Sequence, residues 1–413
     1  MTKLHSLFVL AGLVAGLGAG AAIHASGDAT LEQASPYVEA FGGLWLNALR
    51  MTVIPLIVAL LITGVASVAD AAKTGGLVAR FVLLFSVLLF GAAIYSVLFT
   101  QSILSAFPVD RAAADAFLQS VSGEAAPAQA PSFSQWLQSL APSNPVRAAA
   151  EDQVLPLVVF ALFFGFAATR IAPALRTLVI DFFRAVAETM VVVVHWVLLA
   201  GPFGVFALAL GLGRTAGFEA AGVLAHYVLV VAGAIFGITI VGVLLALSWG
   251  RQPVGRYFAA TAPVWAIAMS TQSSIASLPA MLEAARGGLR IPERIADIFL
   301  PLAVAVFRFT SPVGNLAVVL FIAHLFGFEP SFLQLASAVF VSYGVSIGAV
   351  GLPGQVSFIT SIAPIGLALG VPIELLGILI AVEVFPDIFR TLGNCAGDLA
   401  ITSILSRGER SSG

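Results

Sequence analysis

The chain has 413 residues, of which 60% are hydrophobic and only 10% carry a charge. A soluble domain carries about 25% charged residues, so no soluble fold hides this much apolar surface. The net charge of −2 and the single cysteine, Cys395, exclude a basic nucleic-acid-binding surface, a disulfide framework and a thiolate metal cluster. The composition therefore predicts an all-α integral membrane protein.

Apolar stretches long enough to cross a bilayer, which takes roughly 20 residues, recur along the whole chain. The eight candidates lie near residues 7–25, 44–69, 78–103, 154–173, 186–212, 220–249, 297–326 and 374–405. The first also resembles the apolar part of a cleaved signal peptide, but its length and the spans that follow favour a transmembrane helix. Residues 104–150, rich in Ala, Pro, Ser and Gln, are expected to form an external loop with short helical pieces.

Two further apolar stretches, near 257–283 and 333–370, are interrupted in the middle. The interruptions read MSTQSSIASLP (269–279) and SIGAVGLPGQVS (346–357). Backbone that leaves a helix at membrane depth has no water to bond, so it is tolerated only where it lines a cavity inside the protein. We therefore favour two re-entrant helical hairpins, whose tips meet at a site, over two ordinary kinked helices.

The basic residues predict the orientation in the membrane. With eight spans, thirteen Lys and Arg residues between Lys3 and Arg410 fall on one side, and only Arg111, Arg147 and Arg214 fall on the other. Because positive residues concentrate in cytoplasmic segments, both termini are expected to be cytoplasmic in a protein of the cell (inner) membrane.

The last span concentrates its ions in one short stretch, EVFPDIFRTLGNCAGD (383–398). Its polar residues recur every three or four positions and so share one helical face; they are Glu383, Asp387, Arg390, Thr391, Asn394 and Asp398. Each ion at mid-bilayer costs about 2.5–3.5 kcal/mol, so these groups need partners. Arg390 offsets one carboxylate, and a ligand ammonium, a metal ion, protons or Arg308 must offset the others. We interpret the stripe and the hairpin tips as a substrate site near the midplane rather than a structural ion network.

The quoted motifs resemble the dicarboxylate/amino acid:cation symporters, the glutamate-transporter family, from about residue 7 to residue 407. The similar segments are FGGLWLNALRMTVIPLIVALLITGVAS, NPVRAAAEDQVLPLVVFALFFGFA, GPFGVFALAL, QSSIASLP, GAVGLPG and DIFRTLGNCAGD. The resemblance implies eight transmembrane helices plus two re-entrant helical hairpins, in a homotrimer within the lipid bilayer. A transport domain in each protomer would move past a fixed scaffold.

The same resemblance divides the chain into parts. It implies scaffold helices in 1–76, a third span of the transport domain in 77–103 and an external loop in 104–153. Scaffold and trimerisation helices would follow in 154–219, then a sixth span of the transport domain in 220–250 and a transport core in 251–413.

Residue roles follow from the matching positions. Asp387 would bind the ligand's α-ammonium group, and Arg390 would clamp its side-chain carboxylate. Further substrate contacts would come from Thr391, Asn394 and Ser311, from the first tip at Ser273 and Ser274, and from the second at Gly351, Leu352 and Gly354. These roles suit aspartate or glutamate. A C4-dicarboxylate ranks second because it lacks the ammonium, and a neutral amino acid ranks third because Arg390 would lose its partner.

One sodium site of the family is predicted to be absent. The family's seventh helix carries Asn-Met-Asp-Gly-Thr, and the residues here are Phe307, Arg308, Phe309, Thr310 and Ser311. In the third helix, a tyrosine and two hydroxyl residues are replaced by Phe85, Leu88 and Leu89. These side chains supply no oxygen, which sodium requires.

A second cation site is expected to be retained, whereas a third, which uses backbone alone, is left undecided by the sequence because backbone survives any substitution. The second would use Asn394 and Asp398 with backbone at Ala303 and Phe307; the third would use backbone alone, at Ala305, Ser346, Ile347 and Ala349. Arg308 is hypothesised to take the space and charge of a sodium ion, so that coupling is reduced or switches to protons, with Glu383 or Asp398 as the protonated group. Alternatively, Arg308 reaches an interface or pairs with Glu383. Sodium or protons are then the coupling ions, and no other cofactor is expected.

Other classes of protein fit less well. An intramembrane hydrolase is disfavoured, since none of the candidate nucleophiles Ser273, Ser274 and Ser277 lies in a Gly-x-Ser-x-Gly motif and no histidine lies near them, so the protein is not expected to be an enzyme. An anion-conducting channel lined by Arg308 and Arg390 and a transport-inactive family member stay open as alternatives. Saturable, concentrative uptake would distinguish a transporter from both.

Overall fold

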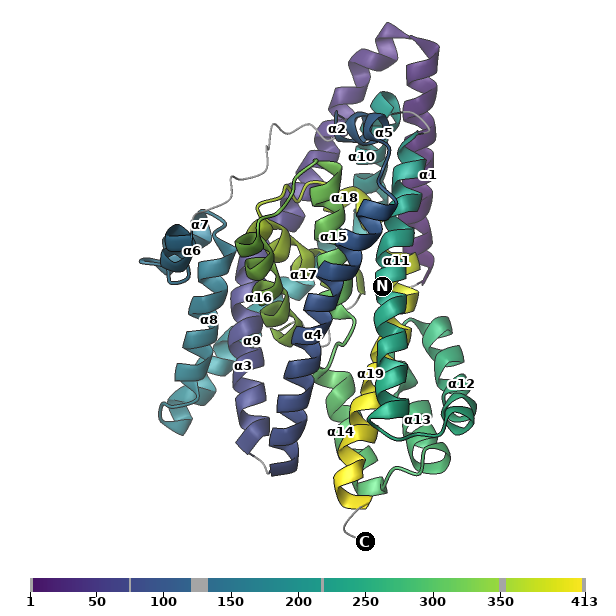
Figure 1. Ribbon diagram of the computed structural model, residues 1–413. Helices are drawn as coiled ribbons and strands as arrows, with labels where there is room; N and C mark the ends of the chain where they lie inside the picture. The colour runs from purple at the N-terminus through teal and green to yellow at the C-terminus, as the bar shows by residue number, and fades with distance from the viewer. Residues whose placement is uncertain (1–2, 74–75, 120–132, 217–218, 349–353, 411–413) are drawn as a thin grey trace.

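The chain folds into a bundle of helices. The computed structural model describes residues 3–73, 76–119, 133–216, 219–348 and 354–410, and the fold is given for these ranges. Every regular element within them is helical, and most of the long helices run in a common direction (Figure 1). The all-α prediction is therefore confirmed for the described residues.

The first half of the chain contains the helices that border the bundle. They are α1 (Lys3–Ser26), α2 (Ala29–Arg50), α3 (Val53–Lys73), α4 (Gly76–Ala106), α5 (Arg111–Gln119), α6 (Phe133–Ser139), α7 (Pro145–Ala150), α8 (Val154–Ala168), α9 (Pro173–Leu199) and α10 (Gly201–Ala216). The three short helices α5, α6 and α7 lie within the segment predicted to be an external loop.

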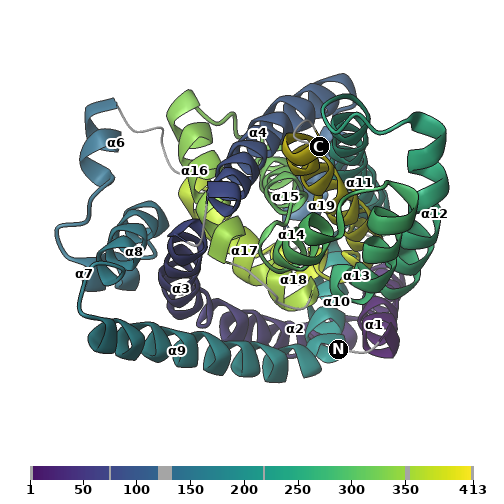
Figure 2. The ribbon, with the colours of Figure 1, turned by 90° about the horizontal axis from the view of Figure 1, so that it is seen from below.

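The second half supplies the centre of the bundle and the helices on one side of it (Figure 2). Its helices are α11 (Glu219–Ser248), α12 (Val254–Thr271), α13 (Ser274–Glu283), a π-helical turn at Ala284–Gly288, α14 (Glu293–Val306), α15 (Ser311–Leu325), α16 (Phe332–Gly348), α17 (Gly354–Leu369), α18 (Leu376–Leu379) and α19 (Val384–Arg410). Viewed from below, α14 and α15 lie near the middle, with α3 and α9 on one side and α11 and α12 on the other (Figure 2).

Glycine permits the closest helix contact among the bordering helices. Gly12, Gly16 and Gly20 recur every fourth residue of α1, on the face that meets α10. A Cβ atom at any of them would lie 2.2–2.4 Å from a backbone oxygen of α10. Small residues at this spacing let two backbones approach closely, which is how helices gain packing energy in lipid.

Long apolar helices account for four of the eight predicted spans, and a bent helix pair for a possible fifth. Four stretches are long and apolar enough to cross a membrane: Leu7–Ser26, Ala29–Ala66, Gly76–Ala106 and Ala220–Ser248. A fifth span is possible if α9 and α10, which meet at an angle of 58°, act together. The predicted span at 154–173 is the shorter helix α8, and those at 297–326 and 374–405 are broken.

The breaks in these last two spans have local causes. The stretch 297–326 divides into α14 and α15 because Phe307 adopts an extended conformation and Pro312 occupies the first turn of α15. In the stretch 374–405, α19 begins only at Val384, after the short helix α18 and a run of turns. Glu383 thus lies one residue before the helix whose charged stripe it was expected to share.

The two interrupted stretches form helix pairs. Helices α12 and α13 pack together and are separated only by Gln272 and Ser273, a narrower break than the sequence suggested. Gln272 is in the left-handed conformation with φ of 53°, and the side chain of Ser273 caps α13 by accepting the N–H of Ala276. Helices α16 and α17 also pack together, and their connection, 349–353, lies outside the described residues.

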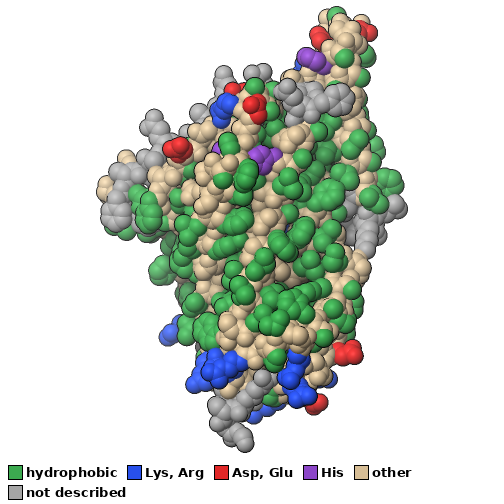
Figure 3. Space-filling model, turned by 45° about the vertical axis from the view of Figure 1, so that its right-hand side comes forward, with side chains coloured by type: hydrophobic (Ala, Val, Ile, Leu, Met, Phe, Trp, Pro, Cys, Tyr) green, Lys and Arg blue, Asp and Glu red, His purple; other side chains and the backbone are tan. Residues whose placement is uncertain are grey.

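Helix α15 is almost completely enclosed. Every one of its residues is buried except His324, as expected for a helix that is apolar on all sides. The outer face shown in Figure 3 has the opposite character: hydrophobic side chains cover its middle, and Lys and Arg gather at its lower end. An apolar band with basic residues at one end is typical of a multi-pass membrane protein.

Candidate functional site

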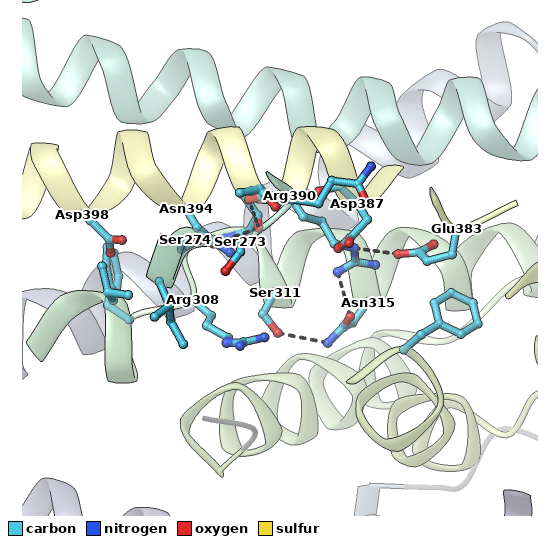
Figure 4. Close-up of a pocket in the computed structure, with 17 residues that line it drawn as sticks. Ser273, Ser274, Arg308, Ser311, Asn315, Glu383, Asp387, Arg390, Asn394 and Asp398 are labelled. Atoms are coloured by element: carbon cyan, nitrogen blue, oxygen red, sulfur yellow. Dashed lines mark hydrogen bonds and ion pairs between the residues drawn. The ribbon is translucent and has the colours of Figure 1, made fainter. Parts of the chain in front are cut away.

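A polar cavity of about 200 Å³ lies where the α12–α13 connection, the α14–α15 break and α19 meet (Figure 4). Its charged residues are two arginines and three acids. The lining consists of Gln272, Ser273, Ser274, Ile275, Val304, Phe307, Arg308, Thr310, Ser311, Asn315, Phe358, Glu383, Asp387, Arg390, Thr391, Asn394 and Asp398. Most of the substrate residues proposed from the sequence are therefore brought together, although they come from segments more than a hundred residues apart.

The stripe of the last helix faces this cavity. Five of its six polar residues, from Asp387 to Asp398, lie on α19, and all six line the same space. The helical period explains this arrangement, because residues three and four apart share one face. Packing of α19 against α11 and α14 covers other sides of the helix.

The break between α14 and α15 is fastened to α19 by hydrogen bonds. The backbone N–H and the hydroxyl of Thr310 both donate to Oδ1 of Asn394, at 3.0 and 2.9 Å. The Thr310 hydroxyl also lies 3.1 Å from the backbone oxygen of Arg390. Non-helical backbone inside a membrane must have its polar groups satisfied within the protein, and Asn394 provides this for Thr310. Asn394, expected from the sequence to contact the ligand, therefore uses its Oδ1 to hold the break between α14 and α15.

Arg390 is held from two sides. Its Nε donates to Oε1 of Glu383 at 2.8 Å, and its Nη1 donates to Oδ1 of Asn315 at 3.1 Å. Its Nη2 is buried and has no hydrogen-bond partner among the described residues. The guanidinium group is therefore fixed by two of its nitrogens, which leaves the third as the donor available to a ligand.

Further hydrogen bonds extend this arrangement across four helices. The Tyr227 hydroxyl on α11 lies 3.3 Å from Oε2 of Glu383. On the other side, Nδ2 of Asn315 donates to the Ser311 hydroxyl at 3.2 Å, and the Ser346 hydroxyl of α16 lies 3.3 Å from it. Glu383 is only 4% exposed, so the ion pair with Arg390 is shielded from water. Each bond of such a buried network restricts the movement of the groups that it joins.

Two members of this network were missed at the sequence level. Asn315 carried a signal, because it is an amide in an otherwise apolar segment, four residues after Ser311. Tyr227 carried none, since a tyrosine in a long apolar helix is ordinarily a packing residue.

Asp398 has different surroundings from Glu383. It is 0% exposed, and neither carboxylate oxygen has a hydrogen-bond partner among the described residues. Arg308 lies within electrostatic range of both Asp398 and Asp387. In Figure 4 the Arg308 side chain extends along the cavity toward Ser311. A buried carboxylate without hydrogen bonds requires a cation or a proton.

The aromatic residues that are predicted to replace the family's sodium ligands pack against one another. The ring centroids of Phe85 and Phe307 are 6.0 Å apart, and those of Phe307 and Phe309 are 5.6 Å apart. Phe81 extends the cluster, 5.9 Å from Phe85, and all four side chains are buried. Aromatic rings thus fill the space between α4 and the α14–α15 break.

The other proposed cation ligands are placed in part. Ala303 is buried in α14, and its carbonyl oxygen accepts the N–H of Phe307 at 2.6 Å. Ser346 and Ile347 are buried in α16, away from the cavity wall, and Gly354 begins α17. Ala349, Gly351 and Leu352 lie outside the described residues, as does the side chain of Ala305. Among the described residues no cluster of three His, Cys, Asp or Glu side chains is suited to a metal ion.

Known proteins are similar to this chain over almost its whole length. The proton/glutamate-aspartate symporter of Escherichia coli (strain K12) is 27% identical over 406 residues, covering 97% of this chain and 92% of that protein. The proton/sodium-glutamate symport protein of Geobacillus stearothermophilus is 27% identical over 403 residues, covering 97% and 93%. The human neutral amino acid transporter B(0) is 27% identical over 434 residues, covering 95% and 78%.

The sequence pattern that defines one family matches residues 6–407. This range includes the cavity, the helix pairs around it and the fastened break between α14 and α15. It also agrees with the extent of the resemblance inferred from the motifs. The chain belongs to the sodium:dicarboxylate symporter family, whose members are membrane transporters and not enzymes.

Proposed function

We propose that this protein takes up a small acidic amino acid, aspartate or glutamate, by cation symport. One observation carries the proposal: the buried cavity of about 200 Å³ combines a carboxylate, Asp387, with an arginine donor, Nη2 of Arg390, that has no protein partner in the described chain. A ligand with an ammonium and a carboxylate satisfies both groups. The polar groups of Thr391 and of the tip at Ser273 and Ser274 lie around the same space. The names of the bacterial relatives agree with this ligand class.

The proposal includes a topology. Helices α12, α13, α16 and α17 have 18, 10, 17 and 16 residues, which suits re-entrant hairpins better than spans. Eight spans with cytoplasmic termini in the inner membrane would then follow. The predicted domains and the homotrimer belong to the same proposal, with 1–76 and 154–219 in the scaffold and 77–103, 220–250 and 251–413 in the moving part.

The coupling is proposed to require fewer cations than in relatives with the family's usual motif. Three carboxylates and two guanidinium groups line the cavity, a net charge of −1 when all are ionised. The usual motif has methionine in place of Arg308 and aspartate in place of Phe309, which makes the site two charges more negative. Because a net charge buried in the membrane is costly, those two charges would require two more cations. The phenylalanine cluster supports loss of one sodium site, and Asp398 is the group that a proton or the remaining cation would neutralise.

The purified protein in liposomes tests the proposal. Labelled aspartate is supplied while proton and sodium gradients are imposed separately. We expect saturable uptake that concentrates aspartate under an inward proton gradient without sodium. Strict and steep dependence on sodium would overturn the coupling scheme. An anion current without accumulation of aspartate inside the liposomes would identify an anion channel. No uptake of any acidic ligand would identify an inactive family member.

One observation favours a second candidate, a C4-dicarboxylate. Arg308 lies within electrostatic range of Asp387, so its guanidinium group can offset the carboxylate that an ammonium would otherwise neutralise. A dicarboxylate without an amine then leaves no charge uncompensated at Asp387. Competition of unlabelled succinate with labelled aspartate in the same liposomes distinguishes the two ligand classes.

A further inference from the structure

Gly314 on α15 is in contact with the guanidinium group of Arg390. Gly314 is buried, and a Cβ atom built on it would lie 2.5 Å from Cζ, 2.6 Å from Nη1 and 2.7 Å from Nη2 of Arg390. Real Cβ atoms do not approach other heavy atoms within 3.0 Å. Because Cζ is the nearest of the three atoms, the missing side chain would point at the face of the guanidinium plane. Arg390 therefore occupies the space that a side chain at this position would fill.

The remaining contacts of Arg390 allow it little room to move. Glu383 holds Nε at 2.8 Å, Asn315 holds Nη1 at 3.1 Å, and Glu383 is itself in contact with Tyr227. The backbone of Gly314 on α15 blocks movement of the guanidinium group in a third direction. These contacts together set the position of Nη2, the donor that has no hydrogen-bond partner among the described residues.

We propose that Gly314 is a positioning residue that sets the preference of this site for ligands with a second carboxylate. The inference rests on the proposed uptake of acidic amino acids. Any side chain at position 314 displaces the guanidinium group and breaks its bond to Glu383 or to Asn315. The backbones of α15 and α19 need not move, because the atoms that collide belong to a side chain and not to backbone. Affinity for an acidic ligand falls, whereas affinity for a neutral amino acid, which does not use Arg390, is maintained.

The test compares Gly314→Ala with Gly233→Ala in liposomes. Gly233 lies within α11, and a Cβ atom there meets nothing within 4 Å, so this variant reproduces the gain in helix propensity without the collision. Loss of one charged hydrogen bond predicts a roughly ten- to hundredfold rise in KM for aspartate in Gly314→Ala. The weaker binding of alanine, measured as its inhibition constant for the uptake of labelled aspartate, is expected to change by less than about twofold, since no lost bond contributes to it. Equal KM values for aspartate in the two variants, or equal rises in the KM for aspartate and the inhibition constant for alanine, would overturn the inference.

A double-mutant cycle with Arg390→Gln isolates the contact. Removing Arg390 removes the collision, so Gly314→Ala should have no further effect on KM for aspartate in that background. The melting temperatures of the same four proteins, measured without ligand, give a second readout that does not depend on transport. Coupling between the two positions of at least about 2 °C is expected. Absence of uptake by the wild type would contradict the proposed function alone, whereas absence of coupling would contradict the role of Gly314 whatever the ligand.

Discussion

The two ends of the cavity satisfy their charges in different ways. At one end, Arg390 is bonded to Glu383 and Asn315, and a tyrosine and two serines complete the network. At the other end, Asp398 has two buried carboxylate oxygens that have no hydrogen-bond partner among the described residues. Figure 4 shows Glu383 and Asp398 at the opposite ends of the line of labelled residues.

This contrast separates recognition from coupling. A site whose groups are held before the ligand arrives binds without further reorganisation, which suits the Arg390 end to recognise a carboxylate. A buried carboxylate without hydrogen bonds is stabilised by a proton or a cation, and Arg308 is only within electrostatic range of Asp398, which suits this end to bind a mobile proton or cation. Substitutions at the two ends are therefore expected to change different measurements.

Replacing Arg390 should have the largest effect. Arg390→Gln removes the carboxylate donor and leaves Glu383 as a buried, unpaired acid. Truncation of one partner of a buried charge pair costs about 2–5 kcal/mol, so affinity for aspartate should fall by about thirtyfold or more. Binding titrations of the purified protein measure this change. Arg390→Lys keeps the positive charge but not the planar fork of N–H donors. Its affinity for aspartate is expected to lie between those of the wild type and Arg390→Gln. Unchanged affinity for aspartate in Arg390→Gln would contradict the assignment of this end to recognition.

Replacing Asp398 should abolish coupling while sparing exchange. Asp398→Asn removes the charge that requires a mobile partner, so an imposed proton or sodium gradient should no longer concentrate aspartate. Exchange of internal for external aspartate should continue, because the Arg390 end is intact. Both activities are measured in the same liposomes. Thr402→Val is a suitable control, since its hydroxyl bonds the backbone oxygen of Asp398 one turn away without carrying charge. Gradient-driven uptake by Asp398→Asn would end the distinction between the two ends.

Replacing Arg308 should sharpen the comparison by making the Asp398 end more dependent on cations. Arg308→Met restores the family's usual residue and removes one positive charge near Asp387 and Asp398. One additional cation is then needed, so the apparent affinity for aspartate should rise with added sodium. Losing a charge interaction of about 1 kcal/mol or more corresponds to at least a fivefold difference between sodium and choline buffers. Arg308→Lys keeps the charge and should resemble the wild type. If Arg308→Met and Arg308→Lys respond identically to sodium, the charge of Arg308 has no part in coupling.

The sequence predicts these two ends unequally. Ions recurring with the helical period inside an apolar segment indicated one polar face, so Asp387, Arg390 and Asp398 were found together. The non-helical break at 307–310 between α14 and α15 was not foreseen. It is only four residues long, and a single proline nearby does not distinguish its sequence from that of a continuous apolar helix. Gly314 could not be recognised either. A glycine in an apolar helix is ordinarily a packing residue, and only the position of Arg390, far away in the sequence, gives it another role.

Tyr227 could not be recognised from the sequence for the same reason, since it resembles an ordinary packing residue. Its replacement should have the smallest effect on transport. Tyr227→Phe removes the hydroxyl that contacts Oε2 of Glu383 and keeps the ring against Phe321, whose centroid is 5.4 Å away. One hydrogen bond contributes about 0.5–1.5 kcal/mol, so KM for aspartate should rise by about threefold to tenfold. The inhibition constant for alanine should be unaffected, because Tyr227 acts only through Glu383 and Arg390. A loss of gradient-driven uptake with an unchanged KM would instead place Tyr227 and Glu383 in coupling, and the division between the two ends would have to be redrawn.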